Sequence, residues 1–182
     1  MACDRMHWTT AHISLFYSVE PVRHGTFDLE YVKPERPLNG LCEQLNAHGK
    51  SCVFFYNWEE LRDLAHPGAL VHSQYDSGLR LGFEKASELS VEAAMRYIPE
   101  NLPDFVFLYL GFPDEAGHMH GWMSDEYMRA VNRCWDMAEQ VCAVLPEEYQ
   151  VIAKKIEAYK NQFSSLFEEF INPIRQKLAD NT

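Results

Sequence analysis

Asp114, His118 and His120 are side chains that can ligate a metal ion, and they follow closely on an apolar stretch of the sequence. The apolar run reads FVFLYL and occupies residues 105–110. Its length and composition predict a strand buried on both faces, in the middle of a parallel sheet. Ligands of such sheets bind at the carboxyl ends of the strands. The Asp-x-x-x-His spacing of Asp114 and His118 therefore indicates two ligands of one metal ion, zinc or manganese.

Glycine and proline residues surround these side chains. Gly111, Pro113 and Gly117 are typical of irregular structure, so the sequence predicts a loop after the strand. A catalytic zinc usually has three protein ligands and one open position, and this loop supplies two of them. We interpret His120 as a loop residue or as a group that supports the two ligands.

Apolar periodicity along the chain predicts helices that alternate with short buried strands. The predicted strands are residues 51–56, 71–73, 105–110 and 149–152, and the predicted helices are residues 8–19, 38–48, 58–65, 83–99 and 124–145. Thr9 or Thr10 is the expected N-cap of the first helix and Asn57 that of the third. This alternation predicts an α/β fold with a partial parallel sheet flanked by helices. Three or four strands are few for such a sheet.

Two regions of different character divide the chain. Residues 1–152 are the predicted incomplete α/β domain, and residues 153–182 are predicted to form an amphipathic helical extension. A partial sheet leaves an edge and an apolar face to be covered. We expect the C-terminal helix to cover this face, and the alternative is a homo-oligomer.

Composition limits the partners and the compartment of the protein. The formal net charge is −11 and the sequence contains no basic patch, which argues against duplex nucleic acid as a partner. No apolar run reaches the roughly 20 residues of a membrane span, and we expect no secretory leader. The five cysteines are scattered, as reduced thiols of a cytoplasmic protein are.

Two segments carry a family resemblance. Residues 12–25 read HISLFYSVEPVRHG, in which Pro21, His24 and Gly25 form a Pro-x-x-His-Gly pattern, and residues 114–121 read DEAGHMHG. The first segment resembles the helix and turn after the nucleophile of the alkaline phosphatase superfamily, in its type I phosphodiesterase and nucleotide pyrophosphatase branch. The second is similar to the Asp-x-x-Gly-His-x-x-Gly metal loop of that family. The resemblance covers roughly residues 12–152.

The resemblance implies a fold, an activity and roles for particular residues. It implies an α/β sandwich that binds two divalent metals, usually zinc, and hydrolyses a small phosphorylated substrate such as a phosphodiester or a nucleotide pyrophosphate. Asp114 and His118 would be two ligands of one metal. A threonine or serine at a helix N-terminus would attack phosphorus, and Thr9 is the candidate. An ungapped match places the nucleophile one residue earlier, at Trp8.

The sequence departs from the family pattern at both ends. The family has a metal-binding aspartate on a strand before the nucleophile, and an Asp-His-Gly motif after the strand that corresponds to residues 149–152. Here AKKIEAYKNQF follows that segment, and no histidine occurs after His120. We therefore expect a metal-dependent phosphoester hydrolase lineage whose active site is incomplete in this chain alone. The alternative is a non-catalytic remnant that acts as a folding or assembly module.

Overall fold

The computed structural model describes residues 8–26, 38–66 and 68–152 of the chain. The chain divides into two compact units, Met1–Tyr149 and Gln150–Thr182. The predicted C-terminal helix, residues 153–182, lies outside the described residues, so the predicted domain boundary and the covering role of that helix stay predictions.

A three-stranded parallel sheet forms the centre of the first unit. Its strands are β1 (Cys52–Tyr56), β2 (His72–Tyr75) and β3 (Phe105–Leu108), and their spatial order is β2-β1-β3. Every residue of β1 is buried, whereas every residue of β3 is half-buried. The prediction that residues 105–110 form the middle strand was therefore wrong: β1 is the middle strand, and β3 has one hydrogen-bonded neighbour among the described strands.

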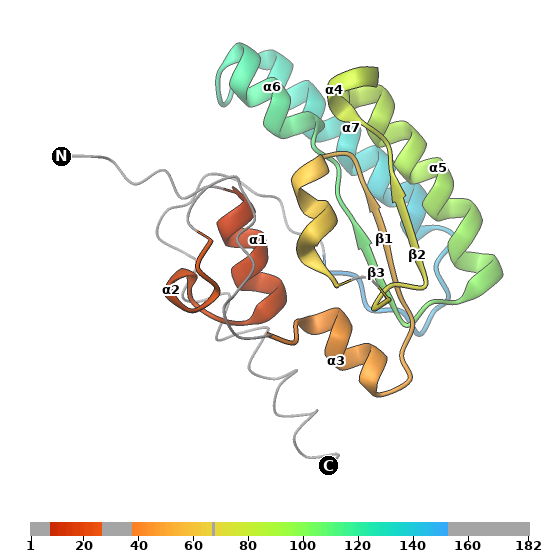
Figure 1. Cartoon of the computed structure of the whole chain (residues 1–182). Helices are drawn as coiled ribbons and strands as arrows, with labels where there is room; N and C mark the ends of the chain where they lie inside the picture. Colours follow the sequence, from red (N-terminus) through yellow and green to blue (C-terminus); the bar gives the residue numbers. More distant parts are fainter. Residues whose placement is uncertain (1–7, 27–37, 67, 153–182) are drawn as a thin grey trace. The chain divides into compact units, whose positions relative to one another are not determined.

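Helices cover both faces of this sheet, which confirms the predicted α/β fold (Figure 1). The helices of the described residues are α1 (Trp8–Tyr17), α2 (Pro21–His24), α3 (Leu41–Ala47), the 3-10 helix η1 (Glu59–Leu64), α4 (Gly78–Leu81), α5 (Phe83–Asn101), α6 (Phe112–His120) and α7 (Asp125–Cys142). Because successive strand side chains point to opposite faces, Phe54 packs with α1 and η1 while Phe55 packs with α5 and α7.

The boundaries of several elements follow from local chemistry. Gly49 ends α3 at a positive φ of 72°; its N–H donates to Asn46 O, and the N–H of Lys50 donates to Leu45 O. These two bonds form a Schellman motif, in which glycine accepts the positive φ. Ser124 caps α7, because its hydroxyl accepts a hydrogen bond from the N–H of Tyr127 at 3.2 Å.

Two local predictions were wrong. α1 begins at Trp8, so Thr9 and Thr10 lie inside the helix and neither is its N-cap. Residues 149–152 form no strand, and Val151 and Ile152 are more than half exposed. An apolar sequence becomes a strand only where a neighbouring strand can pair with it.

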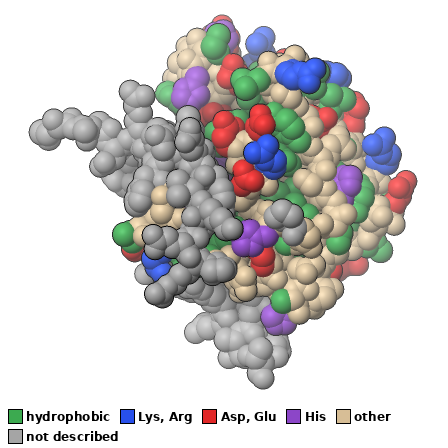
Figure 2. Space-filling view, viewed as in Figure 1, with side chains coloured by type: hydrophobic (Ala, Val, Ile, Leu, Met, Phe, Trp, Pro, Cys, Tyr) green, Lys and Arg blue, Asp and Glu red, His purple; other side chains and the backbone are tan. Residues whose placement is uncertain are grey.

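No helix among the described residues is both long and apolar enough to cross a membrane. Lys and Arg side chains are interspersed with Asp and Glu on the face shown in Figure 2.

Asp104 joins the amino ends of β1 and β3. Its Oδ2 accepts hydrogen bonds from the backbone N–H and the hydroxyl of Ser51, each at 2.9 Å, and its Oδ1 accepts one from Lys50 Nζ at 2.9 Å. The N–H of Asp104 donates in return to Ser51 Oγ at 3.0 Å. These donors lower the pKa of Asp104 from 3.8 to about 2, and the Ser51 N–H has the largest effect.

Substitution of Asp104 by asparagine is expected to lower stability at pH 7. A carboxyl group whose pKa is depressed in the folded state stabilises the fold at pH values above its ordinary pKa. This stabilisation is lost as the pH falls through the pKa of the folded state. The difference in Tm between wild type and Asp104→Asn should therefore shrink between about pH 4 and pH 2. Asp136→Asn, at an exposed position of α7, is the control. A difference in Tm that does not depend on pH would contradict this role.

Asn57 joins the carboxyl ends of all three strands. Its Nδ2 donates to Ser87 Oγ at 2.9 Å, its Oδ1 accepts from the N–H of Gly111 at 3.0 Å, and its main-chain oxygen accepts from the N–H of Gly78 at 3.0 Å. The prediction that Asn57 caps the helix after β1 was therefore wrong. Trp58 holds the N-cap position of η1, and the Asn57 side chain points into the fold and is buried.

Asn57→Ala is expected to lower the free energy of unfolding by about 2–4 kcal/mol, because it leaves buried polar groups without a partner. Asn101→Ala is the matched control: Asn101 is exposed and its Nδ2 donates to Tyr97 O at 2.9 Å. We expect the control to change stability by less than about 0.5 kcal/mol. Equal effects of the two substitutions in urea denaturation would show that the Asn57 side chain does not connect the strands.

Candidate metal-binding site

The segment predicted as a metal loop is a helix, α6, and this prediction was wrong. Gly111 is the N-cap residue, so Pro113 falls in the first turn, where its missing N–H removes no helical hydrogen bond. Gly117 serves packing rather than a turn, since a Cβ there would lie 2.5 Å from the ring of Trp122. The residues expected to break regular structure therefore occupy positions where a helix accepts them.

The helix brings the two predicted metal ligands together. Asp114 and His118 are four residues apart and share one face of α6, with His118 Nε2 3.7 Å from Asp114 Oδ2. His120 is two residues beyond His118, a spacing at which helical side chains do not face each other. We therefore do not place His120 in the site.

Asp114 carries an acceptor without a donor. Its Oδ1 is buried, and no hydrogen-bond partner for this atom exists among the described residues. Burial raises the pKa of the Asp114 carboxyl, the charge of His118 opposes this rise, and Glu115 adds to it. A buried carboxylate oxygen without a donor is costly to the fold, and a cation would satisfy it.

His118 is held from its other side by an aromatic ring. Its imidazole meets the ring of Trp122 edge-on, with the ring centroids 5.4 Å apart. Trp122 in turn contacts the ring of Tyr127 at 5.5 Å, so the start of α7 supports the end of α6. The His118 side chain remains 60 % exposed, which leaves its nitrogen accessible to an ion from solvent.

An aromatic cluster lies beside the carboxyl end of β3. The His12 ring on α1 lies 5.6 Å from the Tyr109 ring and 6.4 Å from the Trp58 ring, and Trp58 stacks on Tyr109 at 6.2 Å. Burial raises the pKa of the Tyr109 hydroxyl, and the negative charges of Asp114 and Glu60 raise it further. The first half of α1 therefore packs beside Tyr109, just after β3.

The sequence analysis did not select His12 or Tyr109 as site residues. The contact of His12 with Tyr109 joins positions about a hundred residues apart, and no local pattern encodes it. A signal was present for Tyr109, which ends the apolar run just before Gly111 and so falls at the carboxyl edge of the strand.

The candidate nucleophile Thr9 is the second residue of α1, and its side chain lies outside the described part of the structure. Its neighbour Thr10 has a buried hydroxyl with no hydrogen-bond partner among the described residues. The position of Thr9 in the first turn of a helix agrees with the role that the resemblance implies, and the role itself stays a prediction.

His24 has a structural role, as the interpretation of this segment as a turn predicts. The N–H of Thr26 donates to His24 Nδ1 at 3.1 Å, so the neutral ring carries its proton on Nε2 and donates to Ser14 Oγ at 2.9 Å. Burial lowers the pKa of His24 and keeps it neutral. Gly25 follows with a positive φ of 76°.

No third ligand accompanies Asp114 and His118 in the described part of the chain, where no group of three or more His, Cys, Asp or Glu side chains is arranged to hold a metal ion. Asp114 and His118 can therefore supply two of the ligands of a divalent cation, and the Asp114 Oδ1 lacks a donor that would compete with the cation. Further ligands would come from residues outside the described ranges, from a partner, or from water and substrate.

No family model matches this sequence, and no significantly similar curated protein was found.

Asp114→Asn is expected to stabilise the metal-free fold at pH 7. A raised pKa means that the folded state binds the proton more tightly than the unfolded chain, so stability falls as the pH rises above the ordinary value of 3.8. An asparagine carries no charge and removes this cost. The substitution also removes the favourable interaction of the Asp114 charge with the N-terminus of α6. This loss is smaller than the gain, because burial is the largest influence on the pKa of Asp114.

The measurement is the Tm of both proteins in chelator, from pH 7 down to pH 3. We expect Asp114→Asn to have the higher Tm at pH 7, and the difference to disappear as the carboxyl of the wild type becomes protonated. Asp136→Asn is the control, as for Asp104. A lower Tm for Asp114→Asn at every pH would mean that the buried carboxylate has a donor and is not free for a cation.

Proposed function

We propose that this chain is a divalent-metal-binding α/β domain of the phosphoester hydrolase type, in which Asp114 and His118 supply two metal ligands. The observation that carries the proposal is the buried Asp114 Oδ1, which has no donor among the described residues and belongs to a carboxylate 3.7 Å from an accessible imidazole nitrogen. Zinc suits this oxygen and nitrogen pair best, and manganese is the second candidate.

The residues around the pair have roles consistent with this chemistry. A divalent metal would polarise a phosphoryl oxygen and lower the pKa of an attacking hydroxyl. Asp114 and His118 would hold it. The N-terminus of α1, with Thr9 in its first turn, would attract the substrate oxyanion.

A small phosphorylated molecule is the substrate that this proposal implies. We also propose a cytoplasmic location, supported by the four described cysteines, Cys42, Cys52, Cys134 and Cys142, which are all free thiols.

The second candidate is a non-catalytic module with the fold of such a hydrolase. It is favoured by the count of ligands: a catalytic zinc usually has three from the protein, and the described residues offer two in one place. The two candidates agree on metal binding through Asp114 and differ on turnover.

Calorimetric titration of the full chain with zinc and with manganese tests the proposal. We expect binding near or below micromolar Kd, at least about tenfold weaker in Asp114→Ala and in His118→Ala. His120→Ala is the matched control, an exposed histidine of the same helix, and should bind as the wild type does. Absence of binding, or binding that Asp114→Ala leaves unchanged, would refute the metal site.

A hydrolysis assay separates the two candidates. Metal-dependent turnover of a generic aryl phosphodiester, lost in Asp114→Ala and Thr9→Ala, is expected of the enzyme. Metal binding without turnover by the chain alone would favour the non-catalytic module.

A further inference from the structure

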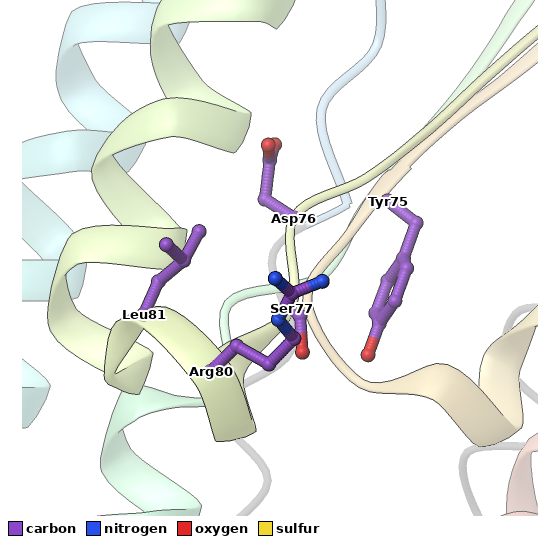
Figure 3. Close-up of a pocket in the computed structure, with 5 residues that line it drawn as sticks. All are labelled: Tyr75, Asp76, Ser77, Arg80 and Leu81. Carbon is purple, nitrogen blue, oxygen red and sulfur yellow. The ribbon is translucent and has the colours of Figure 1, made fainter.

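A hollow of about 310 Å³ lies at the carboxyl end of β2, on the opposite side of β1 from the aspartate–histidine pair. It is lined by Tyr75, Asp76, Ser77, Arg80 and Leu81, from the end of β2 and from α4 (Figure 3). Its volume is at the small end of the range of ligand pockets, roughly 300–1,000 Å³. The carboxyl edge of a parallel sheet is also where such pockets form.

The hollow has one cation and one anion in its lining, Arg80 and Asp76, and the two do not pair. The Arg80 guanidinium forms no ion pair or side-chain hydrogen bond with any described residue. Asp76, the one carboxylate of the lining, is already engaged, since its Oδ2 accepts from Gln74 Nε2 at 2.9 Å and from Ser90 Oγ at 3.2 Å. Figure 3 shows this carboxylate pointing away from the guanidinium. The Arg80 guanidinium therefore keeps its hydrogen-bond donors available to a ligand.

The other lining groups suit a flat, partly polar ligand. The Tyr75 ring is 5.3 Å from the Tyr56 ring at an interplanar angle of 29°, so stacking on the buried middle strand holds it in place. Leu81 is 50 % exposed and adds an apolar surface. The hydroxyl of Ser77 has no hydrogen-bond partner among the described residues, and Ser77 lines the hollow together with Arg80. A ring surface, a cation and a hydroxyl thus converge on one small space.

We propose that this hollow binds a small aromatic oxyanion, a ring that carries a phosphate or a carboxylate group. The Arg80 guanidinium binds the oxyanion with two parallel N–H donors, the geometry in which arginine recognises phosphate and carboxylate. The Ser77 hydroxyl donates to the same group. The ring of the ligand packs against Tyr75 and Leu81. The site uses none of the residues of the metal-binding proposal.

The test is a titration of the full chain with phenyl phosphate, benzoate, inorganic phosphate and benzyl alcohol, in the presence of EDTA. The chelator ensures that no metal at Asp114 holds the anion. We expect phenyl phosphate or benzoate to bind with a millimolar or tighter Kd, and to bind better than inorganic phosphate and benzyl alcohol, which lack the ring or the charge. Whichever of the two aryl anions binds more tightly identifies the oxyanion.

Three variants locate the binding. Arg80→Gln should weaken binding of the aryl anion about 10- to 100-fold, the effect of losing charge-assisted hydrogen bonds. Tyr75→Leu should weaken the aryl anion and leave inorganic phosphate unchanged. Arg96→Gln, an exposed arginine of α5 outside the hollow, is the matched control and should change nothing.

Three results would overturn the proposal. The first is that the wild type binds neither aryl anion at 10 mM, a concentration about tenfold above the weakest expected Kd. The second is that Arg80→Gln binds the aryl anion as tightly as the wild type does. The third is that inorganic phosphate binds as tightly as the aryl anions.

Discussion

The buried amide of Asn57 fixes the edge of the sheet on which both candidate sites lie. Its side chain reaches the segment after β3 through Gly111 and helix α5 through Ser87, and its main-chain oxygen reaches the start of α4 through Gly78. Only a side chain with both a donor and an acceptor satisfies these partners. Gly111 must be glycine for the same reason, since a Cβ there would lie 2.9 Å from Asn57 Oδ1 and from the ring of Phe83.

The two segments that carry the candidate sites begin at residues bonded to Asn57. Gly111 is the N-cap of α6, which carries Asp114 and His118, and Gly78 opens α4, which carries Arg80. A parallel sheet directs both segments to the same edge, because every strand ends there. The order β2-β1-β3 places the strand ends that lead into these two segments on opposite sides of the middle strand.

Two aspartates next to β3 show how surroundings shift the pKa of a carboxyl group in opposite directions. Asp104 precedes the strand and accepts hydrogen bonds from Ser51 and Lys50, which lower its pKa and make its charge stabilising. Asp114 follows the strand and loses solvent on burial, which raises its pKa, and its Oδ1 receives no donor from the residues that the structure describes. A group that costs stability in this way is characteristic of a binding site, where the ligand supplies the missing interaction.

The sequence alone determined the elements and much of their order: the apolar runs that become β1 and β3, the long amphipathic helices, the caps at Gly49 and Ser124, and the pairing of Asp114 with His118 by spacing. These features are local, so periodicity and cap chemistry suffice to find them. The resemblance to a phosphoester hydrolase family and the catalytic role of Thr9 stay predictions.

Only the tertiary structure decided which strand is central, that residues 112–120 are helical, and which distant side chains meet. The apolar runs that become β1 and β3 look alike in sequence. They differ in pairing, since β1 pairs with a strand on both edges and β3 with β1 on one edge. Gly117 lies in a helix because Trp122 packs against it, and His12 reaches Tyr109 because α1 packs across β3. Each outcome depends on what lies across space from a residue, and a one-dimensional pattern does not carry that information.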